Sequence, residues 1–240
     1  MGSHVYYNLF MKTIGLLGGM SWQSTTHYYQ IINEEIASRL GGLHSAKILL
    51  SSVDFAEIEV LQRANRWHES GEILANNANG LRMAGADFIV ICANTMHKVV
   101  DQVEAGSGLP VLHIADATAA AVKASGIQKI GLLGTRYTME EDFYCIRLVE
   151  KHGLQVVIPD ATDREMVNRV IFEELCLGTV LPESKEAYLQ VLQRLENEGA
   201  QGVILGCTEI EMLVTPSDFH LPLFPTTRIH ALAAVDRALS

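Results

Sequence analysis

The chain nearly repeats itself, and this repeat constrains its fold more than any other feature of the sequence. Three short segments return in the same order, with an offset that falls from 116 to 112 residues. The pairs are IGLLGG at 14–19 with IGLLGT at 130–135, GADFIV at 85–90 with GAQGVI at 199–204, and LPVL at 109–112 with LPLF at 221–224. Chance similarity between strands and turns would not keep both order and spacing. We therefore interpret the chain as two copies of one unit.

Each unit alternates short apolar runs with longer amphipathic stretches, which is the pattern of a parallel sheet covered by helices. In the first unit the pattern predicts strands at 12–17, 47–53, 88–92 and 110–114, and helices from Ser21 or Ser24 to about 39, at 55–64 and at 70–84. The sequence thus predicts an α/β protein of two similar lobes, each a parallel sheet flanked by helices. A pseudo-twofold axis would relate the lobes and place the active site between them.

The repeat also sets the expected lobe boundaries. We expect residues 11–115 together with 228–240 to form the first α/β lobe, and residues 116–227 to form the second. Residues 1–10 lack the charged start and apolar stretch of a signal peptide. We interpret them as an expression scar before a natural start at Met11.

Parallel sheets bind ligands at the carboxyl ends of their strands, where helix N-termini face the crevice. Two lobes that face each other would bring two such ends together. The loops predicted to meet there are residues 18–24, 51–55, 93–97, 135–138 and 207–209.

Composition excludes several classes of partner and location. The formal net charge of −10 argues against nucleic acid and anionic membranes as partners. No apolar run reaches the roughly 18 residues of a membrane span. The four cysteines form no C-x-x-C pair and no Cys/His ligand spacing, so we expect no metal site. Without an export signal, a cytoplasmic protein with reduced thiols is expected.

Cys207 is the candidate for proton chemistry. It follows a predicted buried strand at 202–205. Gly206 precedes it and Thr208-Glu209 follows it, and this pattern predicts a turn that exposes a side chain. A thiol at a helix N-terminus has its anion favoured, which predicts a pKa below the usual value of about 8.5. Packing alone explains the other three cysteines, which sit within strand or helix patterns.

In the other lobe the repeat aligns Ala93 with Cys207. Asn94 and Thr95 follow it and supply short polar donors at a strand end, although helix capping would also explain them. His97 is either an acid or base of the site or a surface histidine, and the residues do not decide between these interpretations.

Four motifs together resemble the aspartate/glutamate racemase family, from Met11 to the C-terminus. They are GLLGGMSW at 15–22, NTMH at 94–97, GTRYT at 134–138 and GCTE at 206–209. The resemblance implies a cytoplasmic, pyridoxal-phosphate-independent amino-acid racemase that needs no cofactor and no metal, acts on aspartate and/or glutamate, and commonly forms a homodimer. In that family one acid/base residue from each lobe, usually a cysteine, attacks each face of Cα.

This chain departs from the family pattern at the first of those positions, because Ala93 has no acid or base. Cys92 cannot simply replace it, since successive strand side chains point to opposite faces. Cys207 alone would remove a proton from one enantiomer and leave its return to the same side or to water. Two alternatives stay open. One is a single-cysteine decarboxylase of the same fold, like the arylmalonate decarboxylases, and the other is a catalytically impaired protein that binds a dicarboxylate.

The resemblance also implies how a substrate is held. Its α-carboxylate would meet donors at Asn94, Thr95 and Thr208, with Thr135 nearby, and these would stabilise charge that develops from the carbanion. The remaining candidates are Met20 and Gln62 for the pocket wall, and Arg63, Arg136 or Arg164 for a side-chain carboxylate. A solvated surface role is the alternative for each arginine. We include Arg164 in the predicted site.

Overall fold

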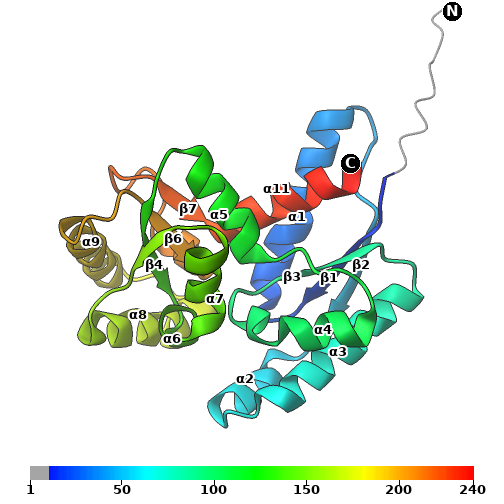
Figure 1. Cartoon of the computed structure of the whole chain (residues 1–240), viewed down its shortest axis with the longest axis horizontal. Coiled ribbons are helices and arrows are strands. Elements are labelled where there is room, and N and C mark those ends of the chain that lie inside the picture. Colours follow the sequence, from blue (N-terminus) through cyan, green and yellow to red (C-terminus); the bar gives the residue numbers. More distant parts are fainter. Residues whose placement is uncertain (1–10) are drawn as a thin grey trace, which may run out of the picture.

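The computed structural model describes residues 11–240 and contains two parallel sheets, each flanked by helices (Figure 1). The first sheet has the strand order β2-β1-β3, and the second has the order β5-β4-β6-β7. The expected α/β fold of two lobes is confirmed. The expression scar that we predicted at residues 1–10 lies outside the described residues. Within 11–240 no helix combines the length and the apolar character needed to cross a membrane.

The elements follow one another in the predicted alternation. The strands are β1 (Ile14–Gly18), β2 (Ile48–Ser52), β3 (Phe88–Ile91), β4 (Lys129–Gly134), β5 (Gln155–Val157), β6 (Val203–Gly206) and β7 (Leu223–Pro225). The helices are α1 (Trp22–Leu40), α2 (Phe55–Arg63), α3 (Trp67–Met83), α4 (Val100–Ser107), α5 (Ile114–Ala124), α6 (Arg136–Glu140), α7 (Asp142–Ile146), α8 (Ala161–Glu173), α9 (Pro182–Asn197), α10 (Ile210–Leu213) and α11 (Thr226–Leu239). The structure also has three short helical turns, at Thr95–Val99, Arg147–Lys151 and Leu175–Leu177.

The strand predicted at 110–114 is the main difference from expectation. Only an isolated bridge between Ile89 and Val111 forms there, and the chain turns into α5 at Ile114. The side chain of His113 accepts a hydrogen bond from the N–H of Ala115 and so caps that helix. This capping ends the extended segment before it can pair further. The equivalent segment of the second lobe does form a strand, β7.

The C-terminal helix returns to the first lobe. Ala231, Ala234 and Val235 of α11 are fully buried in one apolar cluster with Tyr28 and Ile32 of α1. The C-terminal end of the chain therefore packs beside helix α1 (Figure 1). This packing supports the lobe boundaries that we propose, with 228–240 assigned to the first lobe and 116–227 to the second.

Two glycines fix the turns that carry the strand ends. Gly19 has φ +94°, and a Cβ there would lie 2.2 Å from the carbonyl oxygen of Val53. At Gly206 a Cβ would lie 2.8 Å from the carbonyl oxygen of Leu133 on the neighbouring strand. Close backbone approach thus requires glycine at the end of β6 and in the loop after β1.

We predict that Gly19→Ala destabilises the protein more than Gly41→Ala. Gly41 also has a positive φ, +74°, but no atom lies within 4 Å of a Cβ built there. The control should therefore cost only the backbone strain, about 1–3 kcal/mol. Overlap with the Val53 backbone should add roughly 1–3 kcal/mol at Gly19. Urea unfolding measures both values, and equal losses would contradict this account of the turn.

Candidate active site

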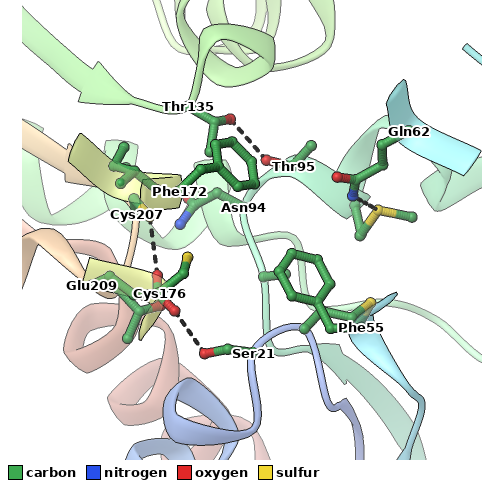
Figure 2. A pocket seen from close by; sticks show the side chains of 16 residues that line it. Ser21, Phe55, Gln62, Asn94, Thr95, Thr135, Phe172, Cys176, Cys207 and Glu209 are labelled. Carbon is green, nitrogen blue, oxygen red and sulfur yellow. Dashed lines mark hydrogen bonds between the residues drawn. The ribbon is translucent and has the colours of Figure 1, made fainter. Parts of the chain in front are cut away.

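A partly open cavity lies where the carboxyl ends of the two sheets face each other. Each of the five predicted loops contributes to its wall, and the helical elements α2 and α8 with the turn after α8 close it. The lining residues are Met20, Ser21, Phe55, Gln62, Ala93, Asn94, Thr95, Met96, Thr135, Ile171, Phe172, Cys176, Gly206, Cys207, Thr208 and Glu209. Figure 2 shows this cavity with both lobes contributing side chains. The topology therefore brings together the segments that the repeat singled out.

Cys207 and Glu209 form the central pair of the cavity. The thiol of Cys207 donates a hydrogen bond to Oε2 of Glu209 at 3.0 Å. The other carboxylate oxygen, Oε1, accepts hydrogen bonds from the hydroxyls of Ser21 at 2.7 Å and Ser24 at 2.9 Å. The two serines stand at the start of α1 in the first lobe, so Glu209 links the lobes at the point where the thiol lies (Figure 2).

The predicted lowering of the Cys207 pKa is wrong for this structure. Burial raises the pKa of the Cys207 thiol well above its usual range, and repulsion from the Glu209 carboxylate raises it further. The helix that follows, α10, has four residues and begins three positions later, so its N–H groups offer little compensation. The thiol is therefore protonated in the free protein, and Glu209 is the group placed to accept its proton.

Ala93 occupies the opposite wall at the end of β3 and lines the cavity with its methyl group. Its neighbour Cys92 is fully buried in the cluster around Tyr28, on the other face of the sheet. The Cys92 thiol donates to the carbonyl of Val90 at 3.8 Å, and burial raises its pKa. Cys92 therefore faces away from the cavity, as the strand alternation predicted, and does not replace the missing acid or base.

The four predicted polar residues come together beside Cys207. The hydroxyls of Thr95 and Thr135 lie 3.0 Å apart across the lobe boundary, and Thr208 accepts a hydrogen bond from Thr227 at 2.8 Å. Asn94 donates through Nδ2 to Thr226 at 3.0 Å, while its Oδ1 atom is buried without a partner. This part of the cavity therefore holds hydroxyl donors and an unused amide oxygen next to the thiol.

Met20 and Gln62 both line the cavity, but the predicted arginines do not. Arg164 binds Glu140 at 2.8 Å and the carbonyl of Pro159 at 2.6 Å. Arg63 and Arg136 line a groove outside the cavity, beyond Gln62. The inclusion of Arg164 in the site is therefore corrected, because α8 directs this side chain towards other partners.

His97 is neither of the two things that we expected. Its side chain is buried, so it is not a surface histidine, and it does not line the cavity. Nδ1 lies 2.9 Å from the carbonyl of Ala93, and Nε2 accepts from the N–H of Ile114 at 3.2 Å, so Nδ1 carries the proton. Burial lowers the pKa of His97 to about 4. This neutral imidazole fixes the backbone of Ala93 against the segment that connects the lobes.

Eight of the lining residues were not among the predicted catalytic or substrate-binding residues: Ser21, Phe55, Met96, Ile171, Phe172, Cys176, Gly206 and Glu209. Glu209 and Ser21 belong to two of the motifs quoted above. Glu209 follows Cys207 by two residues, and Ser21 lies at the start of a predicted helix. These positions were the available signal that both residues belong to the site. Phe55 lies in a loop that was predicted to meet the cleft, whereas nothing local marks Ile171, Phe172 and Cys176. Cys176 lines the cavity from the turn after α8, although packing alone was expected for it, and burial raises its pKa to about 12. Within 11–240 no group of three His, Cys, Asp or Glu side chains could hold a metal ion.

We predict opposite effects of Glu209→Gln on the reactivity of the thiol and on proton transfer. The neutral amide removes the repulsion that raises the Cys207 pKa, and each unit of decrease gives about tenfold more thiolate at a given pH. Alkylation of Cys207 by iodoacetamide, followed by peptide mass spectrometry across pH 7–10, should therefore become faster. Proton transfer from a bound ligand to the site, followed as deuterium uptake by the ligand in D2O, should become about 10²–10⁴-fold slower, because the proton acceptor is lost.

The control is the Cys207→Ser variant, because alkylation that persists in it arises at another thiol, such as Cys176. Slower alkylation of Cys207 in the Gln variant, or unchanged proton transfer, would contradict the assignment of Glu209.

Comparisons with known proteins agree with this geometry. A model of the Asp/Glu/Hydantoin racemase family matches residues 17–234. A crystal structure from Yersinia pestis, described as a candidate Asp/Glu racemase, is 59% identical with a TM-score of 0.90, and the match covers 96% of this chain and 100% of that one. An aspartate racemase homologue from Pyrococcus horikoshii OT3 is 36% identical with a TM-score of 0.82, with coverage of 96% and 100%.

A more distant relative is the broad specificity amino-acid racemase RacX of Bacillus subtilis strain 168. It is 20% identical over 235 residues, which is 95% of this chain and 98% of that protein. The similarity to each of these three proteins therefore extends over both lobes.

Proposed function

The chain belongs to the Asp/Glu/Hydantoin racemase family, and from this premise we propose that it is an amino-acid racemase whose proton transfer depends on one thiol, Cys207. The observation that carries the proposal is the hydrogen bond of 3.0 Å from Cys207 to Glu209 inside a cavity between the lobes. A thiol and a carboxylate acceptor placed side by side form the nucleophile-and-base arrangement of covalent and proton-transfer enzymes.

Glu209 takes the proton of the Cys207 thiol when a substrate enters. The resulting thiolate then removes the hydrogen on Cα of one enantiomer, and the thiol is formed again. The electron pair left on Cα moves into the α-carboxylate, where the hydroxyls of Thr95, Thr135 and Thr208 stabilise the developing charge. The unused Oδ1 atom of Asn94 is suited to accept from the substrate ammonium.

Return of the proton decides the stereochemical result. A proton returned by Cys207 restores the original enantiomer, whereas a proton delivered from the side of Ala93 inverts it. The methyl group of Ala93 cannot donate, so inversion depends on water at that wall. We therefore propose that Cα exchange is faster than inversion.

Several finer points of this function are also proposals. They are a reaction without pyridoxal phosphate or any other cofactor, a homodimer, a cytoplasmic location, and aspartate or glutamate as substrate. The names of the relatives support an amino-acid substrate, since one refers to aspartate and another to broad specificity.

The first test is Cα–H exchange in D2O, followed by proton NMR for both enantiomers of a set of amino acids. Wild-type protein should exchange at least one of them, and Cys207→Ser should reduce the rate about 10³-fold or more, because a hydroxyl is a far weaker acid than a thiol. Cys176→Ser is the matched control, since it removes the other thiol in the cavity. Exchange unaffected by Cys207→Ser would overturn the mechanism.

The same samples separate the alternatives. Release of CO2 from an arylmalonate would support a decarboxylase, and measurable binding without exchange would support a non-catalytic dicarboxylate-binding protein.

We also predict that Ala93→Cys increases inversion relative to exchange. A thiol at this wall supplies the second acid, so the ratio of racemisation to Cα exchange should rise roughly tenfold or more, as measured by chiral chromatography of the D2O samples. Ala93→Ser has a similar size but a poor acid, and should leave the ratio near that of wild type. An equal effect of both variants would show that space, and not proton donation, limits inversion.

A further inference from the structure

The hydroxyl of Thr226 joins two segments that lie far apart in the sequence. Thr226 is the first residue of α11, and its side chain is fully buried. The hydroxyl donates a hydrogen bond to the carbonyl oxygen of Leu205 at 2.9 Å and accepts one from Nδ2 of Asn94 at 3.0 Å. Thr226 therefore connects a strand of the second lobe with a loop of the first lobe.

Strand pairing places Thr226 at this junction. Strand β7 pairs in parallel with β6, and Pro225 stands opposite Leu205 in their register. Thr226 follows Pro225 directly, which brings its hydroxyl to the carbonyl of Leu205. Thr226 does not itself line the cavity. Any effect of this residue on a substrate must therefore pass through a neighbour.

The two hydrogen bonds of Thr226 fix the orientation of the Asn94 amide. A carbonyl oxygen only accepts, so the single hydroxyl hydrogen of Thr226 is committed to Leu205. The oxygen of Thr226 can then only accept a hydrogen bond from Asn94. The group of Asn94 that faces Thr226 must therefore be its NH2 group, and the amide oxygen must face another way.

The amide oxygen of Asn94 is left for a ligand. Within residues 11–240 this atom is buried and has no hydrogen-bond partner, and Asn94 lines the same cavity as Cys207 (Figure 2). A buried acceptor without a partner costs free energy, so a donor supplied by a ligand recovers that cost. An α-ammonium group has three N–H donors and no acceptor. An amide held in the opposite orientation would offer it an NH2 group, with which it cannot pair.

We propose that Thr226 is a positioning residue that turns the oxygen of Asn94 towards the α-ammonium group of the substrate. The inference rests on the proposed function and deepens it, because it assigns recognition of the ammonium group to a pair of residues from different elements. The other interpretation of Thr226 is a purely structural link between the lobes. The two interpretations differ in their ligand dependence, since a structural link would support every ligand of the cavity equally.

Two pairs of ligands that differ in the ammonium group test this assignment. Glutarate and succinate are glutamate and aspartate without that group. Thr226→Val has nearly the same shape but no hydroxyl, so the amide of Asn94 is no longer held in one orientation. It should weaken binding of glutamate and aspartate roughly tenfold, because a hydrogen bond to a charged group is lost, and leave binding of glutarate and succinate unchanged. Titrations followed by ligand-observed NMR measure the dissociation constants, with both enantiomers of each amino acid.

Two variants serve as controls. Thr226→Ser keeps the hydroxyl and should bind all four ligands like the wild-type protein. Thr118→Val removes another fully buried hydroxyl, one that donates to the carbonyl of Ile114 at 2.8 Å outside the cavity. It should lose stability through the same kind of missing hydrogen bond and should leave all four dissociation constants unchanged.

Asn94→Ala tests the same assignment from the other side. It should weaken binding of the two amino acids selectively. Adding Thr226→Val to it should weaken their binding no further, because Thr226 acts only through Asn94. This variant keeps the inference testable if Thr226→Val does not fold.

Equal weakening of both ligand classes by Thr226→Val or by Asn94→Ala would overturn the inference, as would unchanged binding of the amino acids. The expected binding pattern without any Cα–H exchange in D2O would overturn the proposed racemase and leave the orientation of Asn94 standing. A wild-type protein that binds none of the four ligands would overturn the inference together with aspartate and glutamate as substrates.

Discussion

The carboxylate of Glu209 is the interaction on which the architecture of the site depends. One of its oxygens accepts from Cys207 in its own lobe, and the other accepts from Ser21 and Ser24 at the start of α1 in the opposite lobe. A buried carboxylate needs such donors, since without them its burial would be very costly. The same group therefore links the two lobes and adds to the burial that keeps the thiol protonated.

The protonated thiol has a functional consequence. A thiolate that persisted in the free protein would be exposed to oxidation and alkylation. In this site burial and the nearby carboxylate of Glu209 keep the proton on Cys207. In the proposed mechanism the proton leaves only when Glu209 accepts it. In the proposed mechanism the α-ammonium of a bound substrate brings positive charge near the Cys207–Glu209 pair, and this charge offsets part of the cost of forming the thiolate.

The two walls of the cavity differ at the positions that the repeat aligns, with a methyl group at Ala93 and a thiol at Cys207. On the Ala93 side, His97 lies within hydrogen-bond distance of the Ala93 carbonyl, and Asn94 and Thr95 line the cavity. In the proposed mechanism this difference between the walls makes Cα exchange faster than inversion.

The sequence by itself determined the α/β alternation, the two lobes and the strand-end loops that meet, because hydrophobic periodicity and turn glycines are local properties. It also identified Cys207 from the strand and turn around it, and the aligned repeat together with the family resemblance identified the departure at Ala93. Only the tertiary structure decided the pKa direction of Cys207, the burial of His97 and the exclusion of Arg164. Each of these depends on which side chains from distant segments share one enclosed space, and a pattern of residues along the chain does not encode that proximity.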